Sequence, residues 1–284
     1  MSFAGSASGG FKSVKLDLLK CRDGSRPRVL LAEDSPAARV LTGALLKRIG
    51  CKVDAAEHGE EAVDYVRNGE YDLILMDIEM PVMDGMVAAK EIRTMGGAAA
   101  KTPIVALSAF LADTQKSDFW EKDFDIALSK PADKHKLHAA ISEILASEPK
   151  PCEEIFSEPL DNSSVGRDVE EHKLARIFLN ICQDDQVMLL KTASEEISTN
   201  SSELAVCHHR SDEKGVAIVL HKLSGLSATF AATTLFEMVM ALRIEINADV
   251  VGNIEQQVQA ICECAERTAQ ILKSKIRDLP EVSE

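Results

Sequence analysis

The feature that most constrains the fold is a short apolar run, Leu73–Met76, that lies between Asp72 and Asp77. Four consecutive apolar residues are typical of a strand that is buried on both faces, as in a parallel sheet covered by helices. Such a strand delivers the carboxylate of Asp77 to its carboxyl end, where open α/β sheets place their sites. The run therefore predicts a parallel sheet with Asp77 at a functional edge.

Three further short strands are predicted, and each runs into polar residues that could act beside a reactive carboxylate. These segments are Val29–Ala32 followed by Glu33 and Asp34, Ile104–Leu107 followed by Ser108, and Ile126–Ser129 followed by Lys130 and Pro131. Any one of these polar groups alone is usually a helix cap or part of a turn. Because helical patterns separate the strands, a parallel sheet would gather all of them at one edge. Their order along the chain therefore favours a single site.

The predicted site has the composition of a phosphoryl-transfer centre. Glu33, Asp34 and Asp77 offer hard oxygen ligands suited to Mg²⁺, which binds through a few carboxylates and keeps several waters. With the metal and Lys130 neutralising charge, Asp77 could take a phosphoryl group as an acyl phosphate. Ser108 could donate a hydrogen bond to a phosphoryl oxygen.

From about Arg28 to Leu145 the chain resembles the receiver domain of response regulators. The resemblance rests on the residues above and on two further segments, Gly59–Val63 and Met80–Gly85. It implies an α/β doubly wound, flavodoxin-like fold with five parallel strands, over residues 28–147.

The resemblance also implies a role for each polar residue at the predicted edge. Asp77 matches the phosphoacceptor, Ser108 the switch hydroxyl and Lys130 the lysine that pairs with the phosphoryl group. The implied metal ligands are Glu33, Asp34, Asp77 and the backbone carbonyl of Glu79.

Two neighbouring positions complete the comparison with receivers. Many receivers carry an aromatic switch residue three positions before the lysine, and this chain has Ala127 there, although Phe110 is a large group two residues past Ser108. Receivers often have a cis peptide bond at the position of Lys130–Pro131, which the modest cis penalty before proline permits.

Length, charge and cysteine usage limit the classes of protein to which the chain could belong. Its 284 residues are too many for one receiver and suit two domains. The formal net charge of -14 argues against a nucleic-acid surface, and there is no helix-turn-helix sequence or basic aromatic stretch. Seven cysteines without framework spacing suit a reducing cytoplasm. We expect a cytoplasmic chain, or the cytoplasmic end of a membrane-bound sensor kinase, without membrane contact of its own.

Two segments are predicted to be flexible. Residues 1–27 begin with a Ser, Gly and Ala stretch and have no apolar core long enough for a signal peptide or a membrane span, so they are interpreted as a leader. Residues 148–167 contain prolines among acids and serines and are interpreted as a linker. About twenty such residues have a root-mean-square reach of roughly 25 Å, enough for the receiver edge to meet a site on its neighbour.

Beyond the linker, residues 168–279 have helical periodicity throughout. The predicted helices are Asp168–Asn180, Asp184–Cys207, Ser211–Phe230, Ala232–Ala248 and Ile254–Leu279. Apolar stripes on the last three favour core packing, and the last four helices would close an antiparallel four-helix bundle.

The third of these helices carries a histidine opposite its apolar stripe. The stripe consists of Val216, Val219, Leu220, Leu223, Leu226 and Phe230. At about 100° per residue, His221 lies nearly opposite its middle, so we expect the imidazole to face solvent. Its neighbours on that outer face, Ser224 and Gly225 among them, are small. A glycine inside a helix costs about 1 kcal/mol relative to alanine, which favours close approach by another protein at this face.

The segment His221–Ala228 resembles the phosphohistidine motif of histidine phosphotransfer (HPt) domains, with Asp212 upstream where that family often has an acid. The resemblance implies that His221 is the phosphorylated residue and that residues 168–279 form an all-α HPt domain. Two positions depart from the pattern. Ser224 stands where a lysine usually lies beside the phosphoryl group, and Ala231 replaces a usual glycine.

The two resemblances together predict a phosphorelay protein of a two-component system, similar to the C-terminal part of hybrid sensor histidine kinases. The expected route runs from a phosphohistidine of an upstream histidine kinase domain to Asp77, then to His221, then to the receiver of a downstream response regulator. No Gly-rich ATP lid is present, so the chain is expected to carry phosphate without taking it from ATP, and its status as an enzyme stays open. Two alternatives also stay open: a stand-alone receiver–HPt relay protein, and a phosphorylation-controlled binding module whose helical bundle does not transfer phosphate.

Overall fold

The computed structural model describes residues 17–108, 123–130, 132–146, 168–178, 181–248 and 253–279. The predicted linker at 148–167 lies outside these residues, as do residues 1–16 of the predicted leader, Phe110 and Pro131.

The first half of the chain forms a five-stranded sheet in the order β2-β1-β3-β4-β5, with every neighbouring pair parallel. The strands are β1 (Arg28–Ala32), β2 (Lys52–Ala56), β3 (Leu73–Asp77), β4 (Ile104–Ser108) and β5 (Ile126–Ser129). The chain order reverses between β1 and β3, as in doubly wound flavodoxin-like sheets. This topology confirms the fold predicted for the receiver.

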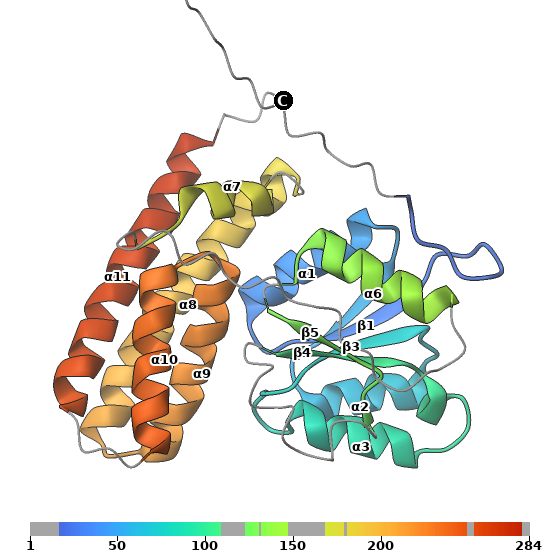
Figure 1. The fold of residues 1–284 in the computed structure, drawn as a ribbon, viewed down its shortest axis with the longest axis horizontal. Helices are drawn as coiled ribbons and strands as arrows, with labels where there is room; N and C mark the ends of the chain where they lie inside the picture. The colour runs from blue at the N-terminus through green and yellow to red at the C-terminus, as the bar shows by residue number, and fades with distance from the viewer. Residues whose placement is uncertain are drawn as a thin grey trace, which may run out of the picture.

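Helices cover both faces of the sheet (Figure 1). The cluster containing α1 (Pro36–Arg48) and α6 (Lys134–Ala146) buries Leu73 and Leu75, while the cluster containing α2 (Gly59–Asn68) and α3 (Gly85–Thr94) buries Ile74 and Met76. A short 3-10 turn at Ala99–Lys101 precedes β4. Side chains of β3 thus alternate between two apolar cores, which explains why this strand is apolar at every position before Asp77.

Part of the predicted leader is ordered against the receiver. Leu19 is buried, and its backbone amide donates to the carbonyl of Ile49 at 2.8 Å. The Arg26 side chain donates to the carbonyl of Gly50 at 2.9 Å. The prediction of a flexible leader is therefore wrong for residues 17–27. The Leu19 side chain of this segment is buried, and two backbone carbonyls at the end of α1 accept hydrogen bonds from it.

The second half of the described chain is helical, and its helices end within a few residues of the predicted bounds. They are α7 (Glu171–Phe178), α8 (Gln183–His209), α9 (Glu213–Thr229), α10 (Thr233–Asn247) and α11 (Ile254–Asp278). Both α8 and α10 pack against α9 and α11, so the four long helices enclose a common core (Figure 1). The predicted apolar stripe of α9 is buried in that core. None of the helices among the described residues is long and apolar enough to cross a membrane.

The two halves contact each other through α1, α8 and α9. The carboxylate of Glu196 in α8 accepts a hydrogen bond from the backbone amide of Ala37, in the first turn of α1, at 3.1 Å. That amide has no partner within its own helix, because the first turn of any helix leaves its N–H groups unpaired. Glu196 of the helical half therefore provides the hydrogen-bond acceptor that the Ala37 amide lacks within α1.

Candidate functional site

The carboxyl edge of the sheet holds a compact acidic cluster. Glu33 and Asp34 follow β1, and Asp77 is the last residue of β3. One carboxylate oxygen from each lies within 4.8 Å of the others. The Nζ atom of Lys130, just after β5, lies 2.6 Å from Oδ2 of Asp77 and 2.7 Å from Oε2 of Glu33. The structure thus brings together four of the polar residues that the sequence placed at this edge.

Ser108, the remaining predicted residue, ends β4 at the same edge. It is buried and pairs in register with Ser129, and its carbonyl accepts a hydrogen bond from the backbone amide of Lys130 at 2.7 Å. Ala127, in the place of the usual aromatic switch, is buried within β5.

Burial and crowding of charge dominate the electrostatics of the cluster. Burial raises the pKa of Asp77 well above its ordinary value, against the lowering effect of Lys130, and Glu33 raises it further. Burial and the charge of Glu33 likewise raise the pKa of Asp34. Burial alone would lower the pKa of Lys130, but the charges of Asp77 and Glu33 outweigh it and the pKa is raised.

The composition of the cluster fits a hard divalent cation. The cluster contains three carboxylates and one ammonium group, which contacts two of them, so the site carries more negative than positive charge when ionised. Its donors are all oxygens, at the spacing from which carboxylates can share one ion. Mg²⁺ prefers such a set and retains water in the remaining positions.

The β3–α3 loop connects this cluster to the helical half. It turns sharply, because Asp84 caps α3 and the Gly85 amide donates to the carbonyl of Ile78 at 2.7 Å. A Cβ atom on Gly85 would collide with the backbone oxygen of Asp77, so only glycine fits there. Val82 has a φ of 67°, a rare backbone conformation for a β-branched residue. The loop is thereby fixed close to Asp77.

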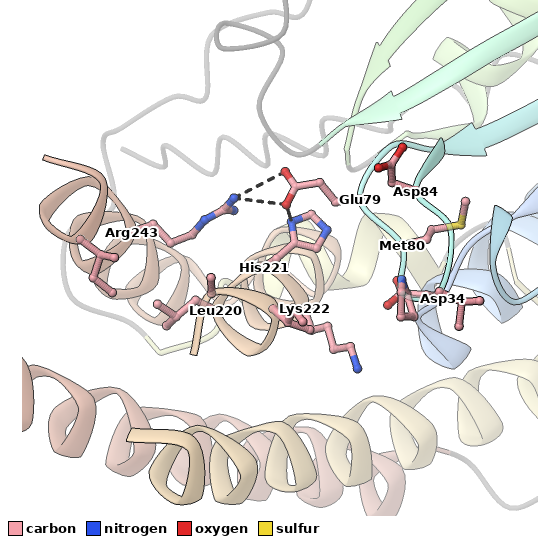
Figure 2. A pocket seen from close by; sticks show the side chains of 13 residues that line it. Asp34, Glu79, Met80, Asp84, Leu220, His221, Lys222 and Arg243 are labelled. Carbon is pink, nitrogen blue, oxygen red and sulfur yellow. Dashed lines mark hydrogen bonds and ion pairs between the residues drawn. The ribbon is translucent and has the colours of Figure 1, made fainter. Parts of the chain in front are cut away.

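This loop presents the side chain of Glu79 to α9 and α10 (Figure 2). Oε2 of Glu79 lies 2.6 Å from Nδ1 of His221 and 3.4 Å from Nη2 of Arg243. Burial alone would raise the pKa of Glu79, but the hydrogen bond from His221 and the charges of His221 and Arg243 outweigh it, so this pKa is lowered. Glu79 therefore binds to two basic side chains of the other half.

His221 does not face solvent, contrary to the expectation from helical periodicity. Its side chain is only 14% exposed, because the β3–α3 loop covers the outer face of α9. A pocket between the two halves is lined by Asp34 and Met80 of the receiver and by His221 and Lys222 of α9. The expected approach by another protein surface is thus made by the receiver of the same chain. Gly225 has open space around it and takes no part in this contact.

The expectation that Ser224 lies exposed beside His221 is also wrong. Ser224 is fully buried, and its hydroxyl donates to the carbonyl of His221 at 2.7 Å. It also accepts a hydrogen bond from Nη1 of Arg243 at 3.1 Å. Ser224 lies one turn after Leu220, on the side of α9 that packs against α10. Arg243 of α10 therefore places a positive charge beside Ser224.

Two functional candidates escaped sequence reasoning. The sequence resemblance predicts the backbone carbonyl of Glu79 as a metal ligand and implies no role for its side chain. Arg243 lies on a helix whose pattern indicated only core packing. No pattern in the sequence relates these two residues to His221, because their meeting depends on how the two halves pack.

Comparison with known proteins agrees with the fold of the first half. A model of the response regulator receiver domain matches residues 29–142. The two-component response regulator ORR41 of Oryza sativa subsp. japonica is 46% identical over 114 residues, which cover 39% of this chain and 87% of that protein. The aerobic respiration control sensor protein ArcB of Escherichia coli is 27% identical over 203 residues, 71% of this chain and 25% of that protein.

The chain spans a quarter or less of the length of several relatives it matches, ArcB included. Among solved structures, the receiver domain of the sensor histidine kinase PA1611 from Pseudomonas aeruginosa PAO1 has a magnesium ion coordinated in its active site cleft. It is 30% identical, with a TM-score of 0.40, and the match covers 43% of this chain and 100% of that one. By its strand order and by its match to ORR41 over most of that protein's length, the chain belongs to the response regulator receiver family of two-component phosphorelay systems, with its receiver domain at residues 29–142.

Proposed function

We propose that the chain is a phosphorelay protein in which a phosphoryl group passes between Asp77 of the receiver and His221 of an HPt domain at residues 168–279. The observation that carries the proposal is the contact between His221 and the β3–α3 loop, which begins at the phosphoacceptor candidate itself. The contact brings the candidate nucleophile of the helical half to the pocket that Asp34 of the receiver also lines.

A further observation supports an HPt assignment for the helical half. Its four long helices pack around one core, as an HPt bundle would, with His221 near the middle of α9.

The receiver residues have complementary roles in this proposal. Glu33, Asp34, Asp77 and the carbonyl of Glu79 would hold Mg²⁺, which when bound neutralises charge between the acids and an incoming phosphoryl group. Asp77 supplies the oxygen that attacks phosphorus. Lys130 stays protonated between two carboxylates and compensates charge on the phosphoryl oxygens, while Ser108 donates to one of them.

The proposed route begins at the phosphohistidine of a separate kinase domain and continues through Asp77 and His221 to the receiver of a downstream response regulator. A place at the C-terminal end of a hybrid sensor kinase and a stand-alone relay protein are both compatible with this route. The rival is a binding module, in which phosphorylation of Asp77 only changes docking. The covered position of His221 is the observation that favours this rival, because a docking contact needs no access to the ring.

Chemical stability of the label separates the two functions. Full-length chain is incubated with radiolabelled acetyl phosphate and Mg²⁺, and base-stable label, which is characteristic of phosphohistidine, is followed over time. Transfer predicts that base-labile label appears first and base-stable label follows. Asp77→Asn should abolish both, whereas His221→Gln should retain the base-labile label and lose the base-stable one. Base-labile label alone in the wild-type chain would leave the binding module as the function.

A further inference from the structure

We propose that the side chain of Glu79 is a positioning residue for His221, holding the imidazole so that Nε2 presents its lone pair to the phosphoryl group on Asp77. The inference rests on the proposed transfer between Asp77 and His221. It gives a receiver side chain a part in preparing the nucleophile of the other half.

Two basic side chains contact the carboxylate of Glu79, whose side chain is 52% exposed. Oε2 lies 2.6 Å from Nδ1 of His221, an ion-pair distance, and that nitrogen is buried without a hydrogen bond of regular geometry. On the other side, Nη2 of Arg243 lies 3.4 Å from Oε2 and 3.5 Å from Oε1 (Figure 2). Arg243 is itself anchored on the hydroxyl of Ser224, which is bonded to the carbonyl of His221. The carboxylate and the imidazole are therefore held by a closed set of contacts.

This contact determines which ring nitrogen can react. An ionised carboxylate only accepts hydrogen bonds, so the nitrogen that faces it must carry the proton. In a neutral imidazole the other nitrogen, Nε2, then has the free lone pair. Figure 2 shows the second ring nitrogen of His221 pointing away from Glu79, toward the side of the pocket where Asp34 and Met80 lie. The reactive nitrogen thus faces the receiver.

The transfer step balances with this protonation. The lone pair of Nε2 attacks phosphorus of the acyl phosphate, the N–P bond forms, and the bond from phosphorus to the Asp77 carboxyl oxygen breaks. Asp77 leaves as a carboxylate, and Nδ1 of His221 keeps its proton. The ring gains positive charge as the N–P bond forms, and the carboxylate of Glu79 lies beside the nitrogen that carries the proton. Glu79 would therefore stabilise the charged ring as well as orient it.

The position of Glu79 in the chain connects the orientation of the His221 ring to Asp77. It lies two residues after Asp77 on the loop that is fixed by the close approach of Gly85 to the backbone of Asp77. The β3–α3 loop thus directly links Asp77, the phosphoryl donor of this step at the end of β3, to the group that holds the nucleophile.

The test uses the full-length chain and two readouts. In unphosphorylated protein labelled with ¹⁵N-histidine at mildly alkaline pH, the nitrogen shifts of His221, assigned by comparison with His221→Gln, report which nitrogen carries the proton. Single-turnover transfer is then started from chains that already carry label on Asp77, so that differences in labelling do not enter the rate. The variants are Glu79→Ala, Glu79→Gln and, as a matched control, Glu60→Gln, which changes an exposed acid in α2.

The wild-type chain and the Glu60→Gln control should show a proton on Nδ1 of His221. Glu79→Ala should lose this preference and slow the transfer about ten- to a hundredfold, the usual effect of losing a hydrogen bond to a charged group. The transfer rate of Glu79→Gln should lie between those of the wild-type chain and Glu79→Ala, because the glutamine amide oxygen can accept a hydrogen bond from Nδ1 but carries no charge. Unchanged shifts in Glu79→Ala, or changed shifts with transfer at the wild-type rate, would overturn the role of Glu79. A wild-type chain that labels Asp77 and never His221 would overturn the proposed function itself, and this role with it.

Discussion

Lys130 shows how the receiver site manages charge at the level of single residues. Its ammonium lies within 2.7 Å of both Asp77 and Glu33, and all three side chains are almost completely buried. A third acid, Asp34, forms no ion pair with any other described residue and lines the pocket. The cluster therefore holds three carboxylates and one cation, and its charge favours binding of a second cation.

Removal of Mg²⁺ should prevent labelling of Asp77 by acetyl phosphate. Without the metal, the carboxylates and the incoming phosphoryl group repel one another, and Lys130 alone cannot compensate. The measurement is the initial rate of base-labile labelling in excess chelator, compared with the rate after Mg²⁺ is restored. Asp34→Asn should shift the Mg²⁺ requirement to higher concentration. Full-rate labelling in chelator would contradict a metal site at Glu33, Asp34 and Asp77.

Sequence reasoning located the receiver residues because strand ends follow from local patterns. Asp77 and Lys130 each come after a short apolar run, and parallel pairing brings such ends to one edge whatever the rest of the chain does. Glu79 and Arg243 could not be related in this way. Their contact depends on the angle between two domains, which leaves no periodic pattern in either segment.

At the scale of the elements, the corner between α9 and α10 explains one departure from the HPt pattern. Ala231 follows the end of α9 with a φ of 54°, at a position where the HPt motif that this segment resembles usually has glycine. The Ala232 amide donates to the carbonyl of Ser227 and the Ala231 amide to that of Ala228, which is the pattern of a Schellman turn. The turn therefore forms with alanine, at a cost in backbone energy.

Ala231→Gly should stabilise the helical domain. Glycine adopts positive φ freely, whereas an L-residue pays about 1–2 kcal/mol, and the greater freedom of glycine in the unfolded chain offsets part of the gain. We expect up to about 1 kcal/mol of added stability, measured by urea unfolding followed through helical circular dichroism. Ala232→Gly is the matched control. Because Ala232 has a φ of -85°, glycine at this position should destabilise the helical domain. Equal destabilisation by both changes would contradict the assignment of strain to residue 231.

The helices themselves were predictable, and the burial of their flanks was not. Periodicity gave the bounds of α8–α11 and the central stripe of α9, because that stripe faces the bundle core. It did not predict that Ser224 is buried, since each helix of a bundle also touches two neighbours at its flanks. The neighbour that covers a flank depends on helix order and crossing, which the pattern of one helix does not contain.

At the scale of the whole molecule, the two domains form a closed arrangement in which His221 faces its own receiver. A downstream receiver cannot reach the imidazole in this arrangement, because the β3–α3 loop already covers it. The proposed relay therefore needs the domains to separate between the two transfers. The contact of Glu196 with α1 lies at the interface that would have to open.

Glu196→Ala should favour the open arrangement. The change removes the carboxylate that accepts a hydrogen bond from the Ala37 amide, so that amide should exchange with solvent faster, as measured by hydrogen exchange. Transfer from His221 to a separate receiver should become faster, and transfer between Asp77 and His221 slower. Glu195→Ala is the matched control, because Glu195 is the neighbouring acid of α8 and is exposed. Equal protection of the Ala37 amide from hydrogen exchange in the two variants would contradict this account of the interface.

The most direct test of the account is the dependence of Asp77-to-His221 transfer on protein concentration. Chains labelled on Asp77 are diluted over a hundredfold range, and the rate at which base-stable label appears is measured at each concentration. Transfer within the closed chain predicts a single first-order rate constant that does not change, and no base-stable label when the chain carries His221→Gln. A rate that rises in proportion to concentration, or base-stable label in the His221→Gln chain, would contradict transfer between Asp77 and His221 of the same molecule.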